Sequence, residues 1–210
     1  AIEAIANGGE VDFEEQVITT FSEKTQCVYN KLVRSGLQNH NLIRDTFLHF
    51  GNNSFSGANL IYQEQANLTN TDGELLLGSF HRIGNNYYIT INSSQLDNRS
   101  PIEIAQTILH ESVHALLRLH YNISQQSFID LFSQYMMEST GSNNITHNIM
   151  RDNYVLAIAN TLEQFDNAQE DFSFYESLAW EGLQDFLTQQ EIDAFLLAQQ
   201  TARNRGLNCN

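Results

Sequence analysis

Residues 100–120, SPIEIAQTILHESVHALLRLH, most limit what this chain can fold into. Ser100 suits the N-cap of a helix, Pro101 suits the first helical position, and Glu103 completes a capping box three residues after the cap. The sequence therefore predicts a helix over 101–119. Three histidines lie on this helix or just after it.

His110, Glu111 and His114 form an HExxH pattern on the predicted helix. Residues four apart on a helix lie about 40° apart around its axis, so both imidazoles can reach one cation. Neutral imidazole suits Zn²⁺, whose catalytic sites use three protein ligands and leave a position for water. Glu111 lies on a neighbouring face, where its carboxylate can take a proton from a water that the metal activates. We therefore expect a zinc site with Glu111 as the general base.

The length and charge of the chain limit its class and its partners. The chain has 210 residues, and no repeat or linker divides it, which favours one domain. A formal net charge of −15 repels phosphate backbones, which argues against nucleic acid as a partner. No apolar run approaches the roughly 18–20 residues that span a bilayer, so we expect no transmembrane segment. The first residues do not read as a signal peptide, but a signal can be removed, so the compartment is unknown and export stays open.

The first half of the chain is expected to hold a helix and then a small sheet. Apolar residues recur at helical spacing over 10–35, which predicts an N-terminal helix within residues 1–36. Over 40–92 the period shifts toward two, in segments such as NLIRDTFLHF and NYYITIN that are separated by turn sequences. This pattern predicts a small antiparallel or mixed sheet.

The second half of the chain is expected to be helical. The metal-site helices cover 100–166 and the C-terminal helices cover 174–205. After the helix over 101–119, the expected helices lie at about 125–138, 147–166 and 174–203. The order of helix, sheet and helices favours a single α+β domain over alternating βαβ units.

A family resemblance follows from the HExxH helix and from the segment before it. The helix with TILHESVHALL, preceded by the strand-like NYYITINSSQL, resembles the zincin metallopeptidases, and it is most similar to SprT-like and related minimal zincins. The likeness covers about residues 75–165. It implies that His110 and His114 bind zinc and that Glu111 is the base. It also implies that the strand near 86–92 is an edge strand, along which an extended protein or peptide substrate binds by β-augmentation.

The third ligand stays open among His120, His147 and Glu138. His120 would complete the metzincin pattern HExxHxxGxxH, but Leu117 stands where that pattern has glycine. The glycine lets the chain leave the helix in a conformation that costs other residues roughly 1 kcal/mol or more. If the helix continues, His120 lies about 120° around from His114 and roughly 9 Å further along the axis, too far to share the metal.

His147 is the third ligand that we favour, because it extends the inward stripe of a helix by one turn. The members of that stripe are Met150, Tyr154, Ile158, Leu162 and Phe165. Glu138 lies at a helix end and lacks the ExxxD pattern of the gluzincins. Tyr154 can be read either as an oxyanion-stabilising group or as a core residue, and core packing is the commoner use.

Two cysteines, one tryptophan and three further histidines complete the set of candidate residues. Cys27 and Cys209 allow either two free thiols or one disulfide that ties down the C-terminal tail in an oxidising compartment. Trp180, in YESLAWEGLQDF, is expected to pack a helical cap onto the core. Three histidines have no partner spacing and are assigned no role: His40, His49 and His81.

The leading hypothesis is a zinc-dependent endopeptidase in which Glu111 is the general base. One alternative is a catalytically silent module that binds zinc or a partner, although the presence of Glu111 argues for turnover. A second alternative is a secreted protease domain of effector or toxin type.

Overall fold

Four strands and a set of helices make up the part of the chain that the computed structural model describes, residues 17–38, 41–51, 58–121 and 151–209 together with 130, 131, 134, 137 and 138. The strands are β1 (Val17–Thr20), β2 (Asn59–Gln65), β3 (Gly78–Ile83) and β4 (Asn86–Asn92). The α-helices are α2 (Glu23–Gln38), α3 (Leu42–Gly51), α4 (Pro101–Tyr121), α7 (Leu156–Asp166), α8 (Phe172–Leu178) and α9 (Gln189–Arg203). Shorter turns are 3₁₀-helical (Ser93–Asn98 and Gln184–Phe186) or π-helical (Arg151–Val155). The protein is of the α+β class, as predicted.

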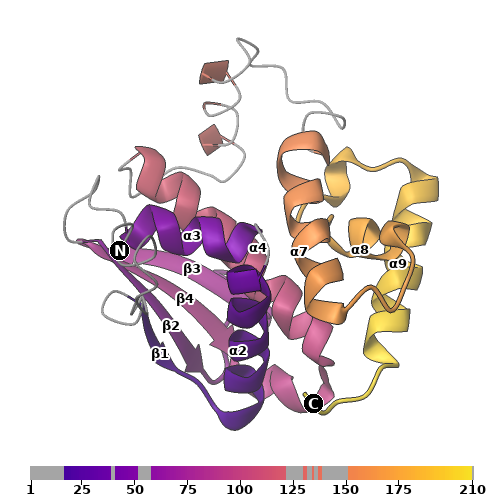
Figure 1. Cartoon of the computed structure of the whole chain (residues 1–210), viewed down its shortest axis with the longest axis horizontal. Helices are drawn as coiled ribbons and strands as arrows, with labels where there is room; N and C mark the ends of the chain where they lie inside the picture. The colour runs from indigo at the N-terminus through magenta and orange to yellow at the C-terminus, as the bar shows by residue number, and fades with distance from the viewer. Residues whose placement is uncertain are drawn as a thin grey trace.

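The sheet has the strand order β1-β2-β4-β3, so β4 is an interior strand and β3 lies at an edge. β1, β2 and β4 run parallel, whereas β3 pairs antiparallel with β4, which makes the sheet mixed (Figure 1). The prediction that the strand near 86–92 forms an edge is therefore wrong. β4 is interior because it pairs with β2 on one side and with β3 on the other, where the tight turn at Gly84, with a φ of +59°, joins β3 and β4 in a hairpin.

The predicted helix over 10–35 begins later than expected, because Val17–Thr20 form strand β1. All four residues of this run are β-branched, which favours a strand, and the run pairs in parallel with β2. Helical spacing holds further on, where Val28 and Leu32 are fully buried on α2. The residues before Val17 lie outside the described part of the chain.

The segment NLIRDTFLHF forms helix α3 and not the predicted strand. Ile43, Phe47 and Phe50 are buried at spacings of four and three residues, which lie on one face of a helix but not of a strand. Asn41 caps the helix, since its Oδ1 accepts a hydrogen bond from the N–H of Arg44 at 3.3 Å. The spacing of the buried residues and the cap both favour the helix.

Helix α4 carries the HExxH residues and lies at the centre of the fold. It packs against β3 and β4, and it also contacts α7 and α9, which lie on the other side of the molecule from the sheet (Figure 1). Its start is as predicted, because the N–H of Ser100 donates to Oε2 of Glu103 at 2.9 Å. The helix over 101–119 is confirmed, and it continues through Leu117 to Tyr121.

Helices α7, α8 and α9 form one group at the end of the chain (Figure 1). The described members of the predicted inward stripe are all buried: Tyr154, Ile158, Leu162 and Phe165. The predicted helix over 174–203 is divided into α8 and α9, because Gly182 has a φ of +78° that a helix cannot contain. Trp180 is buried, as expected. The predicted helix over 125–138 lies mostly outside the described residues.

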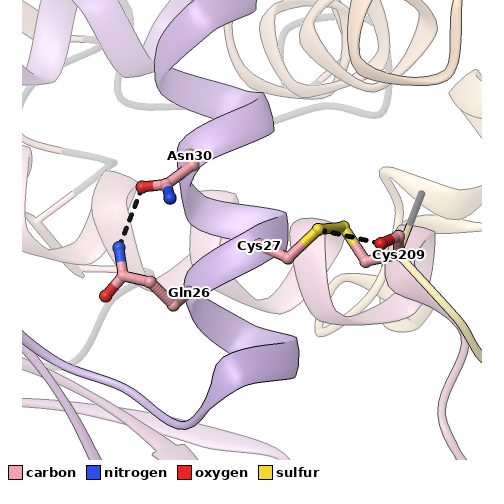
Figure 2. The surroundings of a disulfide bond; sticks show 4 residues. All are labelled: Gln26, Cys27, Asn30 and Cys209. Carbon is pink, nitrogen blue, oxygen red and sulfur yellow. Dashed lines mark hydrogen bonds between the residues drawn. A yellow bond between two sulfur atoms is a disulfide. The ribbon is translucent and has the colours of Figure 1, made fainter.

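A disulfide joins Cys27 on α2 to Cys209 in the C-terminal tail, 182 residues apart (Figure 2). Of the two arrangements that the sequence allows, the disulfide is the one present, and neither cysteine is free. Among the helices of the described ranges, none has both the length and the apolar character needed to cross a bilayer.

Candidate metal site

The imidazoles of His110 and His114 converge on one point beside α4. The residues are one helical turn apart, and their Nε2 atoms lie 3.1 Å from each other. Two nitrogens that bind one tetrahedral zinc ion at about 2.0–2.1 Å are separated by about 3.3–3.4 Å. The pair therefore fits two of the ligand positions of a zinc site. Within the described residues, no third His, Cys, Asp or Glu completes a cluster with them.

Burial favours the neutral form of both imidazoles. It lowers the pKa of His110 from 6.5 to about 4. The pKa of His114 is also well below 6.5, first because of burial and then because of the charges of His110 and Arg118. Neutral imidazole is the form that binds a metal, so the electrostatics of the pair suit a ligand role.

Glu111 lies in a tight space between α4 and the edge strand β3. Only 8% of its surface is exposed, and a Cβ on Gly78 of β3 would come within 3.3 Å of its Cγ. Burial, and then the charge of Glu181, raises the pKa of Glu111 from 4.5 to about 8. A bound cation would lower this pKa again. A carboxyl group that titrates near neutrality can both accept and donate a proton, which suits a general base.

One backbone edge of strand β3 lies close to Glu111 and His114. The N–H of Asn92 donates to the carbonyl oxygen of Leu77 at 2.9 Å, which sets the hydrogen-bonded pairs of the β3–β4 ladder. Because hydrogen bonding alternates along an antiparallel strand, Gly78 and Phe80 direct their N–H and C=O groups away from β4. No other strand of the described residues pairs with that edge. Phe80 also stacks on the imidazole of His114, with ring centroids 6.4 Å apart.

Tyr154 contacts the second nitrogen of His110. Its hydroxyl lies 2.9 Å from Nδ1 of His110, and its side chain is buried. Histidines that bind metals commonly form such a bond through the other ring nitrogen, which sets the tautomer and the orientation of the ring. Tyr154 is thus a core residue, and its polar end holds a candidate ligand.

The segment after α8 reaches the site, which the sequence does not predict. A Cβ on Gly182 would lie 2.7 Å from Cε1 of His110, and Glu181 is close enough to raise the pKa of Glu111. Gln106, one turn before His110, donates to the last carbonyl of α8 at 2.5 Å. The glycine in WEGL indicates a turn, but nothing local indicates which helix the turn contacts.

The alternative third ligands His120 and Glu138 lie beside each other at the surface. Nε2 of His120 is 3.8 Å from Oε2 of Glu138, and the two side chains are 52% and 53% exposed. Neither joins His110 and His114 in a metal-binding cluster of the described residues. His147, the favoured third ligand, lies outside the described residues.

The histidines without an assigned role have other contacts or are not described. Nδ1 of His49 lies 2.7 Å from the carbonyl oxygen of Asp45 in the same helix. His81 stacks on Tyr88 across the β3–β4 ladder, with ring centroids 4.6 Å apart. His40 lies outside the described residues.

No protein-family model, curated protein or solved structure matches this chain. The assignment of a function therefore rests on the geometry around His110, Glu111 and His114.

Proposed function

We propose that this protein is a zinc-dependent endopeptidase of the zincin type. One observation carries the proposal: the Nε2 atoms of His110 and His114 lie 3.1 Å apart on the helix that also carries the buried Glu111. Two neutral imidazoles at this separation suit zinc, and a carboxyl group one residue away suits proton transfer. Strand β3 lies next to Glu111 and His114, and no strand of the described residues pairs with its outer edge.

Each residue has a distinct role in the proposed reaction. His110, His114 and His147 would hold the ion, with His147 assigned from the sequence alone. When bound, zinc supplies a Lewis acid that polarises the peptide carbonyl and makes water acidic enough to attack it near neutral pH. Glu111 accepts the proton of the attacking water and then donates it to the nitrogen of the leaving amine.

The proposed substrate is an extended segment of a protein or peptide that binds along β3. The outward N–H and C=O groups of Gly78 and Phe80 are available for β-augmentation, and both residues contact the HExxH helix. The substrate-binding strand that we propose is β3 and not β4, because β4 has a neighbouring strand on each side. A net charge of −15 argues against nucleic acid as the substrate.

We also propose that the protein works in an oxidising compartment. The Cys27–Cys209 disulfide supports this, because disulfides persist in secreted and periplasmic proteins and are rare in the cytosol. An exported protease is consistent with the second alternative, a secreted domain of effector or toxin type that acts on one protein.

Native mass spectrometry together with a peptidase assay tests the proposed function. Wild-type protein should carry about one zinc ion per chain and cleave an unfolded protein substrate. Glu111→Gln keeps the shape of the side chain but removes the base, so hydrolysis should fall by orders of magnitude while zinc content stays the same. Undiminished hydrolysis in Glu111→Gln would exclude Glu111 as the base. Zinc binding without hydrolysis in the wild type would favour the silent zinc module.

A further inference from the structure

The turn after α8 contains a glycine that its backbone requires. The N–H of Leu183 donates to the carbonyl oxygen of Trp180 at 3.0 Å, which closes a turn with Glu181 and Gly182 at its centre. Gly182 has a φ of +78°. A type II turn requires this conformation at its third residue, and glycine adopts it without steric cost.

The missing side chain of Gly182 also leaves room for His110. A Cβ built on Gly182 would lie 2.7 Å from Cε1, 3.3 Å from Nε2 and 3.7 Å from Nδ1 of the imidazole. Carbon atoms in contact normally lie about 3.5–4.0 Å apart. A Cβ at this position and the imidazole therefore exclude each other. This constraint is separate from the backbone conformation, because the obstacle is another side chain.

Gly182 covers the edge of the imidazole between its two nitrogens. On one side of that edge, Nδ1 of His110 lies 2.9 Å from the hydroxyl of Tyr154. On the other side, its Nε2 lies 3.1 Å from Nε2 of His114. A movement of the ring that made room for a side chain at position 182 would therefore disturb one or both of these contacts.

The turn is held in register with α4. Gln106 and His110 lie one helical turn apart on the same face of α4. Gln106 donates to the carbonyl oxygen of Leu178 at 2.5 Å, and Gly182 follows Leu178 by the same four residues. Trp180 within the turn is buried, so the turn cannot move outward without exposing an indole to water. The ring of His110 is consequently packed against a fixed piece of backbone.

We propose that Gly182 is a positioning residue for the metal site: it seats the imidazole of His110 so that Nε2 faces His114 and Nδ1 faces Tyr154. The consequence for zinc rests on the proposed function, whereas the seating of the ring does not depend on any metal. The segment WEGL thus contributes to the site as well as to the packing of the C-terminal helices.

Gly182→Ala is best compared with Gly73→Ala. Gly73 has a φ of +82°, and a Cβ there would meet nothing within 4 Å. The two substitutions strain the backbone similarly, but only Gly182→Ala crowds an imidazole. In competition with a chromogenic chelator, Gly182→Ala should lose roughly 10- to 100-fold in zinc affinity, as is typical of changes next to a ligand. Gly73→Ala should bind zinc like the wild type. Equal zinc affinity in both variants and the wild type would show that Gly182 does not support zinc binding.

A second measurement needs no metal. In chelator-treated protein, the imidazole nitrogen NMR signals of His110 report the tautomer and the surroundings of the ring. Gly182→Ala should shift these signals and Gly73→Ala should leave them in place. Unchanged signals in Gly182→Ala would overturn the seating of the ring.

Thermal unfolding in a His110→Ala background completes the test. Removal of the imidazole removes the obstacle, so the decrease in Tm caused by Gly182→Ala should shrink to about that caused by Gly73→Ala. If Gly182→Ala alone does not fold, folding of the double variant supports the proposal, and failure of both contradicts it. A wild-type protein that binds no zinc would exclude the proposed function, while the NMR and Tm comparisons would still decide the role of Gly182.

Discussion

The hydroxyl of Tyr154 lies 2.9 Å from Nδ1 of His110. His110 is on α4, and Tyr154 comes from the π-helical turn before α7, 44 residues further along the chain. A metal ion bound at Nε2 of His110 would leave the proton on Nδ1, and the tyrosine oxygen would then accept it. The orientation of one candidate ligand therefore depends on an element outside the HExxH helix.

Tyr154→Phe should weaken zinc binding by about 10- to 100-fold while the fold is kept, because the ring remains and only the hydroxyl is lost. The free energy of unfolding should fall by about 1 kcal/mol, the usual contribution of one hydrogen bond. Chelator competition and thermal unfolding measure the two effects. Wild-type zinc affinity in this variant would leave Tyr154 with a packing role only.

His147→Ala and His120→Ala should behave differently. His147→Ala should lose zinc to a mild chelator and lose activity, because removal of a ligand costs more than the 10- to 100-fold typical of outer contacts. His120 is 52% exposed at the end of an unbroken helix, so His120→Ala should keep zinc and activity. Zinc content and hydrolysis are measured for both. The reverse pattern would make His120 the ligand.

Phe80→Pro should raise KM for an extended substrate more than Phe80→Ala does. Both substitutions remove the ring that stacks on His114, but only proline also removes the N–H that faces the free edge of β3. The β3–β4 ladder should survive in both, because Phe80 does not donate to β4 in this register. Steady-state kinetics on one peptide series separates the variants. Equal KM values would mean that substrate does not pair with this edge.

In the metal-free wild type, the protonated Glu111 should stabilise the fold at low pH, and this stabilisation should be lost as the pH rises. Glu111→Gln has no carboxyl group at this position and should not show this loss. Burial raises the pKa of Glu111 from 4.5 to about 8, so the folded state keeps a proton that the unfolded chain releases between these values. The stability contributed by this group is fully present below pH 4.5 and is lost as the pH rises through about 8.

Urea unfolding in the presence of a chelator, from about pH 5 to about pH 9, measures this effect as the difference between wild type and Glu111→Gln. Contributions that are the same in the two proteins cancel in the difference. The free energy of unfolding of Glu111→Gln, minus that of the wild type, should increase from the low to the high end of this pH range. A difference that stays constant with pH would mean that folding leaves the pKa of Glu111 unchanged.

The disulfide should contribute strongly to stability. Cys27 and Cys209 are 182 residues apart, and a cross-link over so long a loop restricts the unfolded chain. Cys209→Ser should therefore lower the free energy of unfolding by roughly 2–5 kcal/mol. Alkylation of protein made in an oxidising compartment, without reductant, should add no mass. Two alkylated thiols would show that the bond does not form there.

The sequence by itself determined the helix that carries the site and the pairing of the two histidines on it. These are local properties: the cap at Ser100 acts within one turn, and a spacing of four residues brings His110 and His114 together on any helix. For the same reason the continuation of the helix past Leu117 was predictable, because leucine offers no local cause for a break.

Only the tertiary structure decided what surrounds those residues. Strand periodicity says which side chains share a face but not which strand is outermost, so β3 and not β4 became the edge. In the same way, WEGL indicates a turn, but its contact with His110 depends on how α8 packs against a helix formed much earlier in the chain. Such contacts join segments that are distant in sequence. The packing of the whole core selects them, so local propensity does not predict them.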